Sequence, residues 1–226
     1  MRPATRLGLV AALMMHAAAL AHDSHPPPGA DEAAFPIPAP GSYRLPPIKA
    51  AAGGAILDEA GHRLDLLIDV LKGRVSVLAL VYTRCGDVCP LASAGMARLQ
   101  DLAVKDPDLS HRMRLVTLSF DPERDTPEVM RAYAAAWRSG DPVAPDWAFL
   151  TAAGREALAP ILAAYGQQID AKPGGALNHV FRAFLIDPAG RVRNIYSLDV
   201  FEPALVLTDV RTLLLEQSGS EAAQGR

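Results

Sequence analysis

The chain has 226 residues, half of them apolar, and a formal net charge of −3 at pH 7. This length and apolar content predict one folded domain with a buried core, together with segments outside it. The 22 basic residues form no lysine- or arginine-rich run, so we expect no nucleic-acid partner.

Residues 1–21 have the pattern of a secretory signal. Arg2 and Arg6 precede an apolar stretch, residues 7–20, which ends in a small-x-small cleavage site. The stretch is shorter than the ~20 residues of a membrane-spanning helix, and His16 interrupts it. We therefore expect an exported, periplasmic protein with no transmembrane anchor after signal cleavage.

Residues 22–47 contain eight of the 19 prolines of the chain. Such a composition favours extended polyproline conformations, so we predict a flexible segment that does not contribute to the core. At the other end, residues 218–226 are short and polar and predict a disordered tail.

Residues 48–217 are expected to form the folded domain, beginning with a hairpin of residues 54–58 and 63–67. Apolar runs and helix-start signals then alternate along the chain. The expected strands are 75–82, 112–120, 147–150, 180–187 and 191–198, and the expected helices are 91–104, 126–138, 155–165 and 202–215. This alternation predicts an α/β sandwich, with a central mixed sheet flanked by helices.

The chain has only two cysteines, Cys85 and Cys89, and Pro90 follows the second. They lie between the first central strand and the helix after it, a position that predicts a thioredoxin-like sandwich. Exported proteins often use cysteines in structural disulfides. A bond across so short a loop would constrain the unfolded chain little, however, so we interpret the pair as functional.

In a helical turn, Cys85 and Cys89 would lie on one face, where they could hold one soft metal ion or form a disulfide. The helix N-terminus is expected to lower the pKa of Cys89, and Arg84 to act in the same direction. Asp87 is expected to cap the helix. Because a thiolate is both a metal ligand and a redox nucleophile, a low pKa does not distinguish these roles.

One downstream histidine, His179, completes a candidate metal site. Thioredoxin-type oxidoreductases use Cys-x-x-Cys and place a proline before the strand that faces the disulfide, whereas Asn178 and His179 occupy that place here. Two thiolates and one imidazole suit copper in either oxidation state, and zinc also accepts such ligands. The candidate metal ligands are therefore Cys85, Cys89 and His179.

Three sequence strings resemble one family: residues 81–90 around the cysteines, residues 118–128 and residues 178–190. In order and spacing they are similar to the SCO/SenC family, thioredoxin-fold copper proteins that help to assemble the copper centre of cytochrome c oxidase. The resemblance extends over about residues 51–215. It departs from the family pattern at Gly86, where proline is usual, and at Arg84, where an uncharged residue is usual.

The resemblance implies that Cys85, Cys89 and His179 bind copper. It also implies that the loop of residues 121–126 packs beside the site, with Asp125 as a supporting group. The alternative interpretation of this loop is ordinary turn chemistry, since Asp-Pro opens turns and Thr-Pro starts helices.

Two functions follow as hypotheses. The first is a periplasmic metallochaperone that delivers copper to a copper-enzyme apoprotein, such as an oxidase copper subunit, and is not an enzyme in the strict sense. The second is a thiol-disulfide oxidoreductase that uses Cys85 and Cys89 as its redox pair, reduces the copper-ligand cysteines of a partner and draws on a thiol reductant. A peroxide-reducing enzyme is disfavoured, because residues 81–85 lack the Pro-x-x-x-Thr-x-x-Cys pattern.

Overall fold

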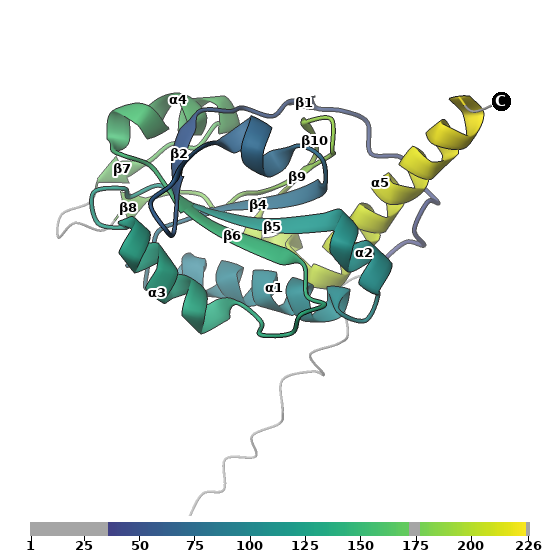
Figure 1. Cartoon of the computed structure of the whole chain (residues 1–226), viewed down its shortest axis with the longest axis horizontal. Helices are drawn as coiled ribbons and strands as arrows, with labels where there is room; N and C mark the ends of the chain where they lie inside the picture. Colours follow the sequence, from purple (N-terminus) through teal and green to yellow (C-terminus); the bar gives the residue numbers. More distant parts are fainter. Residues whose placement is uncertain (1–35, 172–176, 225–226) are drawn as a thin grey trace, which may run out of the picture. The chain divides into compact units, whose positions relative to one another are not determined.

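A computed structural model describes residues 36–171 and 177–224 of the chain, which form a sheet covered by helices (Figure 1). The main sheet has eight strands in the order β1-β10-β9-β4-β5-β6-β2-β3, and β7 pairs with β8 in a separate two-stranded sheet. The signal expected at residues 1–21 lies outside the described residues.

The strands are short at the sheet edges and longest in the middle. Their bounds are β1 Lys49–Ala50, β2 Ala55–Asp58, β3 Arg63–Asp65, β4 Val75–Val81, β5 Met113–Ser119, β6 Asp146–Thr151, β7 Asp170–Ala171, β8 Leu177–Asn178, β9 Ala183–Ile186 and β10 Arg191–Tyr196. The helices are α1 Val88–Ala103, α2 Pro107–Arg112, α3 Pro127–Trp137, α4 Arg155–Tyr165 and α5 Pro203–Gln224, with short helical segments η1 Leu66–Leu71 and η2 Leu198–Val200.

Strand β4 lies at the centre of the sheet. It runs parallel to β5 on one side and antiparallel to β9 on the other. Strand β5 in turn runs parallel to β6. All seven residues of β4 are buried, because helices cover both faces of the sheet at this point. The carboxyl end of β4 leads directly into the cysteine motif, so a central and fully buried strand positions the candidate site.

Helices α1 and α3 lie on one side of the sheet, and α4 and η1 lie on the other (Figure 1). Helix α5 packs against α1 and also contacts β4. This arrangement confirms the expected thioredoxin-like sandwich, with its mixed sheet and its β2–β3 hairpin at the N-terminal side. None of the described helices has both the length and the apolar character needed to span a membrane.

Helices α1 and α2 both differ from the prediction. Helix α1 begins at Val88, three residues before the expected start, so Cys89 lies within its first turn. Pro90 also lies in this first turn, where proline is tolerated because the first backbone N–H groups of a helix have no partner inside it. Helix α2 was not predicted, although Asp106 caps it by accepting a hydrogen bond from the backbone N–H of Leu109, and Pro107 follows the cap.

The proline-rich segment was wrongly predicted to remain free of the core over its described part, residues 36–47. Leu45 is buried, and its carbonyl oxygen accepts a hydrogen bond from the Arg193 guanidinium. The Tyr43 hydroxyl group donates to Asp209, and the backbone N–H of Gly41 donates to Thr212 at 3.0 Å. Extended proline-rich backbone leaves its N–H and carbonyl groups free, so α5 and β10 can bind it. Residues 22–35 lie outside the described part.

The C-terminal tail was also predicted to begin too early. Helix α5 continues through residue 218, where the tail was expected, as far as Gln224. The hydroxyl group of Ser218 donates to the carbonyl of Leu214 at 3.1 Å, so this serine stays within the helix. The following residues include Glu221, Ala222 and Ala223, which are good helix formers and permit the extension.

Candidate metal centre

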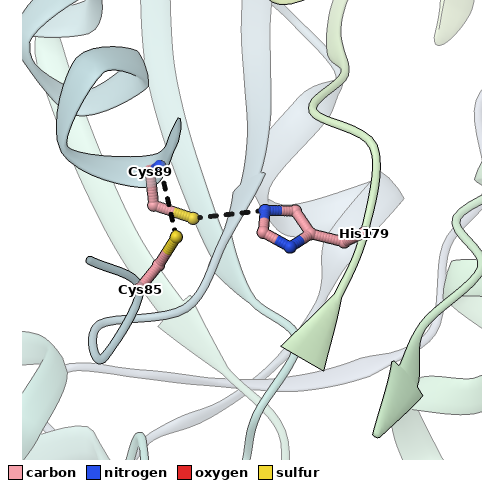
Figure 2. Close-up of side chains that lie close together, drawn as sticks. All are labelled: Cys85, Cys89 and His179. Atoms are coloured by element: carbon pink, nitrogen blue, oxygen red, sulfur yellow. Dashed lines mark hydrogen bonds between the residues drawn. The ribbon is translucent and has the colours of Figure 1, made fainter. Parts of the chain in front are cut away.

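Cys85 and Cys89 are positioned by the junction of β4 and α1. The backbone N–H of Cys85 donates to the carbonyl of Tyr82 at 3.3 Å, which closes a tight turn after the strand. Cys89 lies one helical turn further on, and its own backbone N–H points at the Cys85 sulfur at 3.5 Å. Both side chains are buried and both thiols are free. The local fold therefore places the two sulfur atoms side by side, as Figure 2 shows.

His179 approaches the cysteines from the segment after β8. Its Nδ1 atom lies 3.2 Å from the carbonyl of Leu177, and its Nε2 atom lies 3.5 Å from the Cys89 sulfur (Figure 2). A carbonyl can only accept, so in the neutral ring Nδ1 is the donor and Nε2 has the free lone pair. This tautomer presents a ligand atom toward the sulfurs, the usual arrangement for a metal-binding histidine.

The two sulfur atoms and the Nε2 atom all lie within 4.8 Å of one another. Donors bound to one metal ion at 2.0–2.3 Å are separated by about 4 Å, so a small contraction would suffice to bind an ion. Two thiolates and an imidazole are ligands that copper and zinc accept. The three predicted site residues therefore lie together, in an arrangement that fits such an ion.

The pKa of Cys89 is raised, opposite to the prediction, whereas the pKa of Cys85 is lowered. Burial by itself would raise the pKa of Cys85, but backbone N–H groups of Cys89 and Asp87 donate to its sulfur and bring the pKa below the ordinary value. Burial raises the pKa of Cys89 well above its ordinary value, and the neighbouring Cys85 and Asp125 charges add to this. The donors at the helix N-terminus thus stabilise a thiolate on Cys85, in the turn that precedes the helix.

Two neighbouring residues also differ from expectation. Asp87 occupies the cap position of α1, but its side chain makes no capping hydrogen bond. Arg84 is exposed, and the direction of the Cys85 pKa follows from backbone donors. The pKa of Cys85 is therefore lowered chiefly by backbone donors of the turn, whereas neither of these two side chains has the role that was expected.

We predict that iodoacetamide alkylates Cys85 of the reduced, metal-free protein before Cys89. The thiolate is the reactive form, so a lowered pKa shifts the labelling of Cys85 to lower pH than that of free cysteine, while a raised pKa keeps Cys89 protonated through neutral pH. Tandem mass spectrometry of tryptic peptide 85–98, which contains both cysteines, separates the two rates. Earlier labelling of Cys89, or a Cys85 profile that matches free cysteine in the same buffers, would contradict the assignment.

Asp125 connects the cysteine motif to the neighbouring strand. Its carboxylate is fully buried and accepts hydrogen bonds from the backbone N–H and the hydroxyl group of Thr83, at 2.9 and 2.5 Å, and from the hydroxyl group of Ser119. Thr83 lies two residues before Cys85, and Ser119 ends β5. Asp125 therefore supports the loop that carries Cys85. Its role is not limited to forming a turn within residues 121–126, which was the alternative interpretation.

Two aromatic residues at the site had no assigned role in the sequence analysis. The rings of Tyr82 and Phe120 lie 5.4 and 4.9 Å from the His179 ring, centroid to centroid, and 5.2 Å from each other. Each follows the last residue of a buried parallel strand, β4 or β5. Binding sites in α/β folds form at the carboxyl ends of such strands. The position of Tyr82 and Phe120 at the ends of two predicted strands could therefore have indicated that they lie at the site.

Comparisons with known proteins relate most of the chain to one family. A family model described as SCO1/SenC matches residues 57–215. An SCO1 protein homologue of Bacillus subtilis is 29% identical over 137 residues, which make up 59% of this chain and 67% of that protein.

Solved structures show the same similarity. An SCO1/SenC family lipoprotein from Bacillus anthracis superposes with a TM-score of 0.66 at 26% identity, covering 76% of this chain and 99% of that one. ScoI of Bradyrhizobium japonicum, solved with copper bound, shares the fold with a TM-score of 0.60 at 23% identity, covering 73% and 99%. The family model matches well over half of the length of this chain, so the chain belongs to the SCO1/SenC family.

Proposed function

We propose that this protein binds one copper ion through Cys85, Cys89 and His179 and passes it to a copper-enzyme apoprotein, such as cytochrome c oxidase, in the periplasm. The observation that carries the proposal is the convergence of the three ligand atoms within 4.8 Å of one another. Membership of the SCO1/SenC family and the copper-bound relative from Bradyrhizobium japonicum support copper as the ion.

The ligand set suits an ion that must be both held and released. Thiolates bind Cu(I) well, and the imidazole nitrogen favours Cu(II), so the site accepts both oxidation states. Three protein ligands leave room for a further donor atom, through which a partner could begin ligand exchange. His179 is only half-buried, so it is the ligand that an incoming protein could displace first.

The second candidate function, thiol-disulfide exchange, is favoured by the split between the two cysteine pKa values. The Cys85 thiolate would attack a partner disulfide and form a mixed disulfide. The Cys89 thiol would lose its proton and displace the partner sulfur, so the partner gains two electrons and becomes a dithiol. The resulting Cys85–Cys89 disulfide would then need an external dithiol to be reduced.

A Cu(II) titration of the reduced mature protein without oxygen tests the copper proposal. We expect one tightly bound ion with a sulfur-to-copper charge-transfer band, and an affinity at least ~100-fold lower in His179→Ala, since ligand loss exceeds the effect of outer-shell changes. His111→Ala is the matched control, because His111 is exposed at the end of α2. Weak binding that is equal in wild type and His179→Ala would reject the ligand set and favour thiol exchange.

A further inference from the structure

Tyr82 is buried beside the metal centre, close to both the cysteine motif and His179. It follows β4, its side chain is 5% exposed, and three residues later the chain reaches Cys85. Its ring meets the His179 ring edge-on, at an interplanar angle of 84°. Tyr82 is thus in direct contact with a ligand that lies almost a hundred residues further along the chain.

The Tyr82 hydroxyl group has a hydrogen-bond partner in a distant part of the fold. It accepts from the backbone N–H of Leu177, in β8, at 3.4 Å. The same hydroxyl group is among the groups that lower the pKa of Cys85. Tyr82 therefore connects the end of β4 to the segment that carries His179.

This bond begins a series of contacts around the site. The Tyr82 hydroxyl group binds the N–H of Leu177, and the carbonyl of Leu177 contacts His179 Nδ1. His179 Nε2 contacts the Cys89 sulfur, and the N–H of Cys89 points at the Cys85 sulfur. Leu177 is the central member, because one of its backbone groups meets Tyr82 and the other sets the histidine tautomer.

We infer that Tyr82 is a positioning residue of the metal centre, whose hydroxyl group fastens the backbone segment that orients His179 to the end of β4. Without the hydroxyl group the N–H of Leu177 loses its partner, and the carbonyl that holds Nδ1 becomes free to move with the segment. The position of His179 therefore depends on a side chain that contributes no ligand atom.

Tyr82→Phe tests the inference in the reduced, metal-free protein, because phenylalanine keeps the ring and removes only the hydroxyl group. We expect hydrogen exchange of the Leu177 amide to become about tenfold faster, since it loses its hydrogen-bond acceptor. Tyr133→Phe is the matched control, because the Tyr133 hydroxyl group bonds Ser93 on α1 at 2.6 Å, and none of the hydrogen bonds among the described residues joins it to β8. Unchanged Leu177 exchange in Tyr82→Phe, or equal acceleration in both variants, would overturn the inference.

Copper supplies a second readout, and only this one rests on the proposed function. We expect Tyr82→Phe to weaken Cu(II) binding by about tenfold and to shift the sulfur-to-copper charge-transfer band, because His179 is no longer held in its ligating position. In a His179→Ala background the same change should have little effect on affinity, since Tyr82 acts through His179. Equal losses in both backgrounds would contradict the coupling.

The two readouts separate failure of the inference from failure of the proposed function. If the wild-type protein binds no copper tightly, the proposed function is wrong and Leu177 exchange alone decides the role of Tyr82. If the wild-type protein binds copper but Tyr82→Phe changes neither the exchange nor the band, the copper proposal stands and the role of Tyr82 is rejected.

Discussion

Replacing Cys89 by serine is expected to eliminate both copper binding and thiol-disulfide exchange. A serine hydroxyl group does not ionise near neutral pH and is a hard donor, so the site would lose one of its two soft ligands. We expect the copper affinity to fall by more than the ~100-fold that outer-shell changes cost. Exchange would stop at the mixed disulfide, because Cys85 would have no second sulfur to displace the partner. Chelator competition and a disulfide reductase assay measure the two losses.

The comparison with His179→Ala makes this experiment decisive between the two candidate functions. His179→Ala should lose tight Cu(II) binding but keep most of the thiol exchange, since both sulfurs remain. Ser93→Ala, one turn after Cys89 on α1, is the matched control, because it removes a buried hydroxyl group that bonds Tyr133 and leaves all three ligands in place. Copper binding that survives in Cys89→Ser would exclude the two-sulfur site.

Replacing Asp125 by alanine is expected to destabilise the fold by about 4 kcal/mol. The fully buried carboxylate accepts three hydrogen bonds, and its removal leaves the N–H and hydroxyl group of Thr83 without this partner in the interior. For a domain of this size the loss corresponds to a fall in Tm of roughly 10 °C. Urea unfolding of the reduced protein should show a lower midpoint with an unchanged slope.

Glu123→Ala is the control for this loop. Glu123 lies two residues before Asp125, but its carboxylate is half-exposed and pairs with the exposed Arg155 at 2.7 Å. An exposed ion pair contributes little, so the change should cost no more than ~0.5 kcal/mol. Similar losses in Asp125→Ala and Glu123→Ala would show that Asp125 does not support the cysteine motif as the structure indicates.

The central part of the fold was predictable from local patterns. The buried apolar run of β4, the helix starts at Thr126-Pro127 and the turn before β10 each depend on neighbouring residues, and the structure places the corresponding elements within a few residues of the prediction. The same approach failed for residues 36–47. Their composition indicates an extended chain but carries no information on whether α5 and β10 offer partners for its backbone.

By itself, the sequence identified the candidate site residues: two cysteines at a strand-to-helix junction and one histidine before a later strand. Only the tertiary structure decided that Nε2 of His179 faces the Cys89 sulfur at 3.5 Å, and that Cys85 is the thiol with the lowered pKa. It also revealed the Tyr82 hydroxyl group between β4 and β8. The physical reason is that identity and spacing are local properties of a chain, whereas tautomer, pKa and hydrogen-bond partners depend on groups that only folding brings together.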